Sequence, residues 1–194
     1  MNNEWDDYAD NWNHDPMVQA YAEKAYSSLI EAINIDGLTV LDFGCGTGSL
    51  TQLISPKVSN ILAIDPSSSM IKHLDNKALA NVTTVADYLS EKLISKRPEF
   101  NEKFDLIIAS SVCSFLPDYE ATLGLLKSLL KKNSTFIQWD WLSVKTVTEG
   151  GLSKARVKKA FQANNFINTK ISSPFYIKTD TDKKSVLMAI GKSS

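Results

Sequence analysis

The stretch LDFGCGTGSL, residues 41–50, places glycine at every second position, as Gly44, Gly46 and Gly48, directly after an apolar run. Glycine loses more backbone freedom on folding than any other residue, so a cluster of three needs a physical reason. A glycine adopts positive φ and has no Cβ, and a ligand can therefore approach its backbone closely. The alternative is a tight turn that only packs a strand on a helix. Three glycines after Asp42 make that interpretation the weaker one.

Apolar runs and helix-length segments alternate through most of the chain. Five short runs rich in Val, Ile and Leu have the character of strands buried on both faces: 38–43, 60–65, 82–86, 104–110 and 135–139. An amphipathic stripe from Val18 to Ile33 predicts a helix before the first strand. Alternation of strand and helix predicts an α/β fold with a Rossmann-like, doubly wound sheet. The glycines then lie at the sheet edge where such folds bind ligands.

The last third of the chain departs from this alternation. Residues 153–165 predict a helix with Ser153 as its N-cap. Residues 166–178 and 183–192 predict two strands of a closing hairpin, joined by the polar segment TDTDK. The segment VTEGGLS, residues 147–153, is expected to be a mobile connection.

Composition limits the partners that we expect. The sequence shows no internal repeat or dividing linker, so residues 1–194 are predicted to form a single domain. A formal net charge of -1 creates no long-range positive field, and neither a nucleic acid nor a membrane is expected as a partner. The two cysteines, Cys45 and Cys113, are too few for a disulfide framework, and the acidic start lacks the apolar core of a signal peptide. We therefore expect a cytoplasmic protein. Two cysteines and two histidines form no metal-site pattern, so no metal is expected.

The spacing of the glycines decides which ligand class fits. A dinucleotide loop, G-x-G-x-x-G, would need glycine where Ser49 stands, and a phosphate-binding P-loop would need a terminal Gly-Lys-Ser/Thr that the sequence lacks. The pattern present is D-x-G-x-G-x-G, which resembles the first motif of the class I S-adenosylmethionine-dependent methyltransferases. The resemblance covers residues 38–140. It implies a three-layer α/β/α fold with a seven-stranded, mostly parallel sheet and an antiparallel C-terminal strand. It also implies S-adenosylmethionine as cofactor and S-adenosylhomocysteine as product.

Two further stretches are similar to the family's adenosine-binding motifs. AIDPSSSM, residues 63–70, resembles the second motif, in which an acid that ends strand two accepts hydrogen bonds from both ribose hydroxyls; here that acid is Asp65. VADYL, residues 85–89, is similar to the segment after strand three. The resemblance implies that Asp87 meets the adenine amino group and that the N–H of Tyr88 meets a ring nitrogen.

The segment FDLIIASSVCSFLPD, residues 104–118, resembles the fourth-strand motif, whose end near Ser110 lies beside the methionine part of the cofactor. That part carries an ammonium and a carboxylate, so it needs carbonyl acceptors such as those of Gly44 and Ser110 as well as donors. The resemblance therefore implies this set of cofactor-binding residues: Asp42, Gly44, Cys45, Gly46, Gly48, Asp65, Pro66, Met70, Asp87, Tyr88 and Ser110. Taken singly, Asp65 could start a turn, Asp87 could cap a helix and Met70 could belong to the core.

Departures from the family pattern reduce the number of substrate classes that we expect. Ser114 stands where many members have a histidine, so a catalytic imidazole is not supported there. The usual Pro-Gly-Gly turn before strand five is replaced by KKNST, in which Asn133 is expected to be left-handed. The signatures of amide, adenine-amino and cytosine-C5 methyltransferases are absent.

The sequence names no catalytic residue. A sulfonium methyl is already activated, so alignment in a dry site does much of the work. Asp140 and His14 are the candidates for a general base, but we expect a solvent-facing strand end for the first and an ordinary surface histidine for the second. The prediction is a methyltransferase that acts on a small molecule, with a protein side chain as the second acceptor class. A nucleotide-cofactor oxidoreductase, disfavoured by Ser49 and Asp87, and a regulatory module that binds the cofactor without turnover are the alternatives.

Residues 1–16 are predicted to close over the site. The segment EWDDYADNWNHDP carries Trp5, Tyr8 and Trp12, while its acids interrupt any long apolar face. Such a segment can exclude water from a reaction site as a lid. The alternative is that its aromatic side chains fill the end of the core.

Overall fold

The computed structural model describes residues 4–143, 151–178 and 182–194. Most of the connection expected at 147–153 lies outside these residues, and so does most of the TDTDK segment. The strand order is β3-β2-β1-β4-β5-β7-β6 in a seven-stranded mixed sheet, which confirms the predicted Rossmann-like α/β class. The chain divides into two compact units, residues 1–101 and 102–194.

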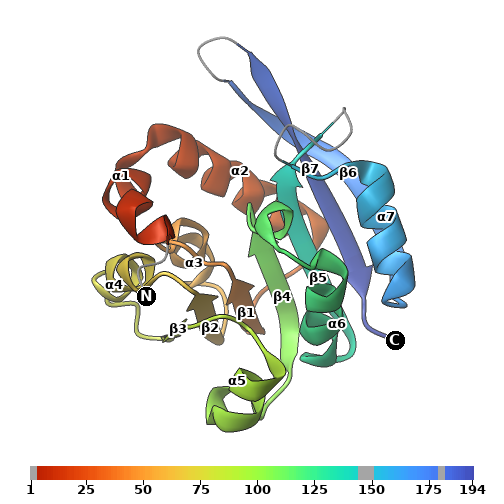
Figure 1. Ribbon diagram of the computed structural model, residues 1–194, viewed down its shortest axis with the longest axis horizontal. Coiled ribbons are helices and arrows are strands. Elements are labelled where there is room, and N and C mark those ends of the chain that lie inside the picture. The colour runs from red at the N-terminus through yellow and green to blue at the C-terminus, as the bar shows by residue number, and fades with distance from the viewer. Residues whose placement is uncertain (1–3, 144–150, 179–181) are drawn as a thin grey trace. The chain divides into compact units, whose positions relative to one another are not determined.

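The first unit contains the three parallel strands β1 (Thr39–Phe43), β2 (Asn60–Asp65) and β3 (Val82–Ala86). Figure 1 shows them side by side in the order β3-β2-β1. Their crossover helices are α3 (Ser49–Ile54) and α4 (Ser68–Asp75). After β3 come α5 (Glu91–Lys96) and the short turn η2 (Pro98–Phe100). Each strand falls within a residue or two of its predicted bounds, because continuous apolar runs are strong signals for buried strands.

From residue 4 onward, three helical segments precede β1: η1 (Glu4–Tyr8), α1 (Ala9–His14) and α2 (Pro16–Ala32). The predicted helix at 18–33 is therefore confirmed. Asp15 is the N-cap of α2, because its carboxylate accepts the backbone N–H of Met17 at 2.7 Å. Pro16 occupies the first helical position, where no N–H is needed.

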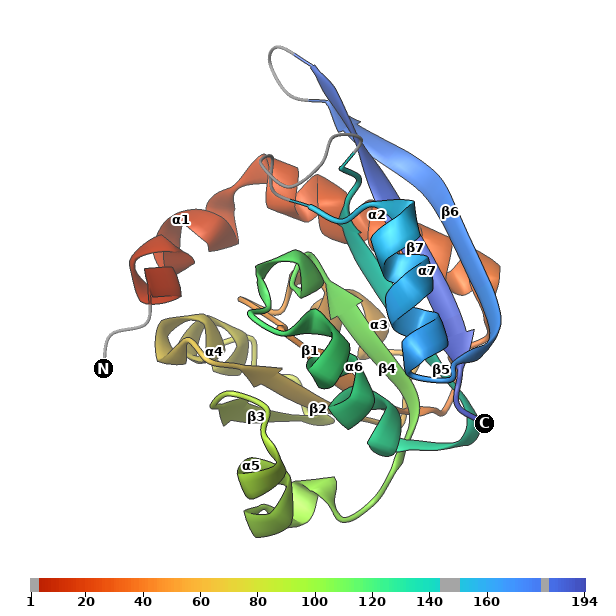
Figure 2. The same cartoon turned by 45° about the vertical axis from the view of Figure 1, so that its right-hand side comes forward.

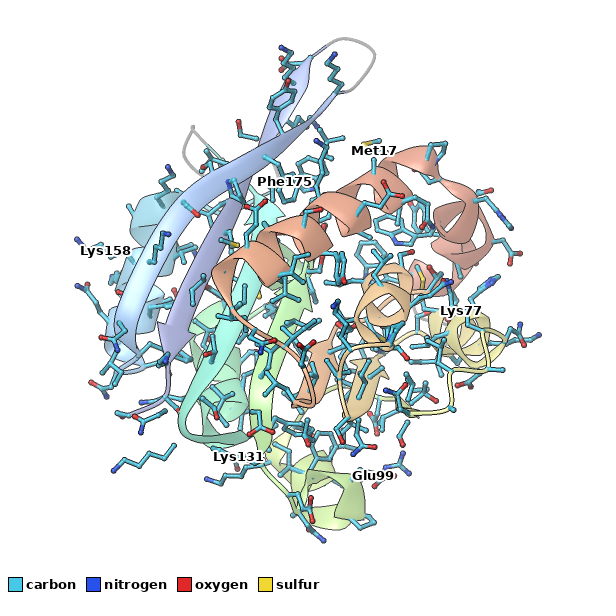
Figure 3. The ribbon with its side chains drawn as sticks, turned by 180° about the vertical axis from the view of Figure 1, so that it is seen from behind. Met17, Lys77, Glu99, Lys131, Lys158 and Phe175 are labelled. Atoms are coloured by element: carbon cyan, nitrogen blue, oxygen red, sulfur yellow. The ribbon has the colours of Figure 1, made fainter. Side chains whose placement is uncertain are left out.

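The second unit begins with β4 (Phe104–Ser110), η3 (Cys113–Phe115) and α6 (Tyr119–Ser128). It continues with β5 (Leu130–Trp141), α7 (Lys154–Ala163), β6 (Ile167–Lys178) and β7 (Lys183–Lys192). β4 and β5 are parallel, whereas β7 is antiparallel to both β5 and β6, so the predicted hairpin is confirmed. Figure 2 shows the long β6–β7 ribbon with α7 against it, and Figure 3 shows Lys158 pointing outward from α7.

In the second unit, the structure confirms the predicted N-cap and the predicted left-handed residue, whereas the fifth strand differs in length from its prediction. Ser153 is the N-cap of α7, accepting the N–H of Arg156 at 3.2 Å. Asn133 has the expected positive φ, 62°. The fifth strand, however, is longer than the predicted 135–139 and includes the KKNST segment. The reason is tertiary, because Asn133 and Ser134 donate their backbone N–H groups to Ser193, at the far end of the chain.

Candidate functional site in the first unit

The three glycines of the loop after β1 all have positive φ: 70° at Gly44, 54° at Gly46 and 79° at Gly48. The reason for glycine differs along the loop. A Cβ on Gly48 would lie 2.4 Å from Cδ1 of Leu74 on α4, so this glycine serves close packing. Of the atoms that the structure describes, a Cβ on Gly46 would meet only the indole Nε1 of Trp12, at 3.7 Å. The packing interpretation is therefore right for Gly48, and the open backbone face that a ligand needs lies at Gly46.

Asp42, in β1, is an internal anchor of the loop. Its side chain is 1% exposed, and its Oδ2 accepts the hydroxyl of Thr51 on α3 at 2.6 Å. Burial raises the pKa of Asp42 to about 7; the Thr51 hydrogen bond works against this rise and the charge of Asp65 adds to it. The carboxyl group thus ties the end of β1 to the helix that follows the glycines.

Asp65, at the end of β2, connects the glycine loop to the turn that follows β2. Its Oδ2 accepts the backbone N–H of Gly46 at 3.0 Å, and its Oδ1 accepts the backbone N–H of Ser67 at 2.9 Å. Burial raises the pKa of this carboxyl, the two backbone hydrogen bonds lower it, and the charge of Asp6 raises it further. A carboxylate has about four lone-pair sites, so two remain for further donors such as a pair of hydroxyls.

After β3, the two residues predicted to bind adenine, Asp87 and Tyr88, are hydrogen-bonded to each other. Asp87 is exposed, and its Oδ1 accepts the N–H of Tyr88 at 2.7 Å, so it caps no helix. The same hydrogen bond occupies the N–H that the family resemblance assigned to an adenine ring nitrogen. The side chain of Tyr88 is 66% exposed. The N-cap of α5 is Ser90 instead, which accepts the N–H of Leu93 at 3.2 Å.

The remaining predicted residues of this unit lie along the loop and α4. Cys45 is half-buried, its backbone N–H is donated to Ile64, and burial raises the pKa of its thiol. Pro66 is half-buried at the end of β2. Met70 is 3% exposed on α4, as expected if it belongs to the core.

Sequence reasoning missed Thr47, which lies between the second and third glycines. Its hydroxyl is buried, and within the described part of the chain it has no hydrogen-bond partner. Buried hydroxyl groups are nearly always hydrogen-bonded, so an unpaired one beside a glycine loop is consistent with a ligand partner. Its position inside GCGTG was the only available signal.

The N-terminal segment contacts α4 through two carboxylates. Asp6 accepts the hydroxyl of Ser67 at 2.6 Å and the N–H of Ser69 at 3.1 Å. Asp10 lies 2.8 Å from Nε2 of His73. Both η1 and α1 therefore lie against α4, as Figures 1 and 2 show. His14 ends α1 and is exposed, as expected.

Predicted residues in the second unit and relatives of the chain

Ser110 is the half-buried last residue of β4. The next residue, Ser111, has φ 57° and donates its N–H to Trp139 of β5 at 2.7 Å. The chain then turns into η3, where Cys113 is buried and burial raises the pKa of its thiol.

The prediction that Asp140 is a solvent-facing strand end is wrong. Asp140 is fully buried, because β5 runs between β4 and β7. It accepts the backbone N–H of Ser114 at 3.0 Å and the amide of Gln138 at 2.9 Å, while Gln138 accepts the hydroxyl of Tyr119 at 2.6 Å. Burial raises the pKa of Asp140 to about 7, and these hydrogen bonds lower it. Asp140 thus holds the turn after β4.

The described residues contain no group of three or more His, Cys, Asp or Glu side chains that could hold a metal ion. Within the same residues, no helix has the length and apolar character to cross a membrane.

Residues 41–136 match the model of a family described as "Methyltransferase domain". Malonyl-[acyl-carrier protein] O-methyltransferase of Acetivibrio thermocellus is 28% identical over 170 residues, which are 81% of this chain and 58% of that protein. Ubiquinone biosynthesis O-methyltransferase of Bradyrhizobium diazoefficiens is 31% identical over 125 residues, 62% of this chain and 47% of that protein. The chain thus spans about half the length of these curated relatives.

Among solved structures, magnesium protoporphyrin IX methyltransferase from Synechocystis PCC 6803 with bound S-adenosylmethionine matches with a TM-score of 0.65. The identity is 20%, over 98% of this chain and 85% of that one, so the likeness shows the fold. The sheet order and the glycine loop define a Rossmann-like protein with a candidate ligand site at the ends of β1 and β2. The chain belongs to the class I S-adenosylmethionine-dependent methyltransferases. The predicted family and its cofactor are therefore confirmed.

Proposed function

We propose that this protein transfers a methyl group from S-adenosylmethionine to a small molecule. The observation that carries the proposal is the 3.0 Å hydrogen bond from Gly46 to Asp65, which places an acceptor carboxylate directly beside the open glycine backbone. A ligand with a ribose diol needs such an acceptor.

The residues around this hydrogen bond fit the cofactor. Asp65 has acceptor capacity left for the ribose hydroxyls, since only two of its lone pairs are occupied by backbone N–H groups. Gly46 has no side chain on the face where a ligand would lie, and the buried Thr47 hydroxyl has no partner among the described residues. Asp87 and Tyr88 would hold the adenine, for which their mutual hydrogen bond must open.

When bound, the cofactor supplies an activated sulfonium methyl. The protein's own contribution is therefore to bind, orient and exclude water. Asp140 is fully buried and hydrogen-bonded to the turn after β4, so we assign it the positioning of that turn and no proton transfer from the acceptor. The proposed mechanism needs no dedicated base when the acceptor atom carries no proton that must leave.

The names of two similar proteins support a small-molecule acceptor: one is a ubiquinone biosynthesis O-methyltransferase, and the other is a magnesium protoporphyrin IX methyltransferase. A protein-bound acceptor is the second class, as in the relative named for malonyl-[acyl-carrier protein]. We propose a cytoplasmic location, which the two free cysteines support.

We also propose that residues 1–16 act as the lid of the site. Support comes from Asp6 and Asp10, which attach η1 and α1 to α4, the helix that follows Asp65. Trp12 lies at the glycine loop itself. The indole of Trp12 thus lies at the loop whose ligand a lid would cover.

The test is a titration of the purified protein with S-adenosylmethionine, S-adenosylhomocysteine and NAD, followed by a search for methylated products. Binding of the first two with methylated product supports the proposal. Binding of NAD alone would establish an oxidoreductase instead, and binding of S-adenosylhomocysteine without turnover across an acceptor panel would favour a regulatory module.

A further inference from the structure

The indole of Trp12 approaches the glycine loop from a distant part of the sequence. Its Nε1 lies 3.7 Å from the point that a Cβ on Gly46 would occupy. The ring belongs to α1, and it packs edge-on against Trp5, with ring centroids 6.1 Å apart and an interplanar angle of 80°. Asp6 and Asp10 fix the same segment on α4. The indole is therefore held at the loop by contacts of residues that precede it in the sequence.

The N–H of this indole has no acceptor among the described residues. Trp12 is half-buried, and its side chain has no polar partner among the described residues. An indole nitrogen is a donor only, and a buried Trp N–H usually has an acceptor. A donor without an acceptor beside an open glycine backbone is suited to an oxygen of a ligand.

The chemistry of the loop shows which end of the cofactor this donor suits. The carboxylate of Asp65 is an acceptor, and it suits ribose hydroxyls. The backbone N–H of Gly46 is already donated to Asp65, so it is less available to an anionic group. The carboxylate of the methionine part needs donors, and Trp12 supplies one beside the same glycine.

We propose that the Trp12 indole N–H donates a hydrogen bond to the amino-acid carboxylate of bound S-adenosylmethionine, so that Trp12 is a cofactor-specificity residue carried by the N-terminal segment. The inference rests on the proposed function, because it requires that this cofactor binds. It assigns the contact with the carboxylate to Trp12 and not to Trp5 or Tyr8, the other aromatic residues of the segment.

The experiment compares two ligands on three proteins by calorimetry. S-adenosylhomocysteine carries the carboxylate, whereas 5′-methylthioadenosine has the same adenosine and sulfur without the amino-acid part. The proteins are the unmodified chain, Trp12→Phe and the matched control Trp5→Phe. Trp12→Phe keeps an aromatic ring and loses the N–H, so its affinity for S-adenosylhomocysteine should fall roughly ten- to a hundredfold, as for a lost hydrogen bond to a charged group. Its affinity for 5′-methylthioadenosine should change less than about twofold, within the error of such comparisons.

Trp5→Phe should change the affinity for both ligands to the same extent. Equal losses for both ligands in Trp12→Phe, or no loss for either, would overturn the proposal and leave Trp12 a packing residue. If the unmodified chain binds neither ligand, the proposed function has failed first.

A second measurement does not depend on the variant's stability. The chain has four tryptophans, so a ¹⁵N-labelled sample gives at most four indole N–H signals. One of them should shift with S-adenosylhomocysteine and stay in place with 5′-methylthioadenosine, and it should be the signal missing from Trp12→Phe. If that variant does not fold, spectra of Phe variants at the other three tryptophans assign the signal by elimination. A signal that responds alike to both ligands contradicts the proposal.

Discussion

Asp65 and Gly46 are joined by a 3.0 Å hydrogen bond from the glycine N–H to Oδ2 of the carboxylate. This bond connects the end of β2 to the loop after β1, and the other oxygen of the same carboxylate accepts the N–H of Ser67. One side chain therefore shapes the loop, starts the turn into α4 and presents its remaining lone pairs to a ligand.

Asp65→Ala should weaken S-adenosylhomocysteine binding by roughly ten- to a hundredfold, because hydrogen bonds to a charged acceptor are lost. It should also lower the melting temperature, since two backbone N–H groups lose their acceptor. Asp87→Ala is the control: Asp87 is exposed and accepts the N–H of Tyr88, and its loss should affect binding less. Calorimetry and thermal unfolding measure both effects, and equal binding by Asp65→Ala and the unmodified chain would refute the ribose role.

Gly48→Ala should destabilise the fold more than Gly37→Ala. Both glycines have similar positive φ, 79° and 73°, so each substitution carries a backbone cost of about 1–2 kcal/mol. A Cβ on Gly48 would lie 2.4 Å from Leu74, whereas a Cβ on Gly37 would have no described neighbour within 4 Å. The additional cost at Gly48 should be about 1–3 kcal/mol, as for overpacking. Urea unfolding measures the difference, and adding Leu74→Ala should relieve the steric part; equal losses at the two glycines would contradict the contact.

Asp140→Asn should change the pH dependence of stability. The pKa of Asp140 in the folded protein is about 7, against 3.8 for the ordinary side chain, because burial disfavours its charged form. The folded state therefore binds the proton more tightly than the unfolded state. The contribution to the unfolding free energy is greatest below about pH 4 and falls as the pH rises toward 7.

Asparagine does not titrate, so the stability of Asp140→Asn relative to the unmodified chain should improve between pH 5 and pH 7. The gain should approach about 1.4 kcal/mol per pH unit at most. Urea unfolding of both proteins at several pH values tests this. A pH-independent difference between Asp140→Asn and the unmodified chain would show that Asp140 titrates normally.

Asp6→Ala should release the N-terminal segment without unfolding the chain. The substitution removes the acceptor of Ser67, the N-cap of α4, and of Ser69 in α4. Asp7→Ala at the exposed neighbouring position is the matched control. Limited proteolysis within residues 4–14 should become faster only in Asp6→Ala, and S-adenosylhomocysteine should slow cleavage in the unmodified chain. Equal cleavage with and without the ligand would contradict the lid.

Deletion of residues 1–14 gives a second test of the lid. The truncated protein should stay folded but lose turnover or much of its cofactor affinity, because water is no longer excluded. Circular dichroism checks the fold. If the truncated protein unfolds, the aromatic side chains of the segment belong to the core instead.

Much of this protein's secondary structure could be predicted from local sequence patterns. Apolar runs predicted the strands, glycine spacing predicted the loop, and Ser153 predicted the start of α7. These signals are strong because each depends on the backbone preferences of a few adjacent residues. Asp65 could be named for the same reason, since an acid that follows a buried strand lies at the sheet edge whatever else the chain does.

Other features depend on contacts between segments that are far apart in the sequence. Asp140 is buried because β4 and β7 flank β5, and β5 extends to Leu130 because Ser193 pairs with its first residues. Trp12 reaches Gly46 because Asp6 and Asp10 attach its segment to α4. The sequence by itself thus determined the elements, the loop and the family, since these follow from short-range periodicity and backbone geometry. Which side chains are desolvated and which donors face the loop depend on long-range packing, and only the tertiary structure decided them.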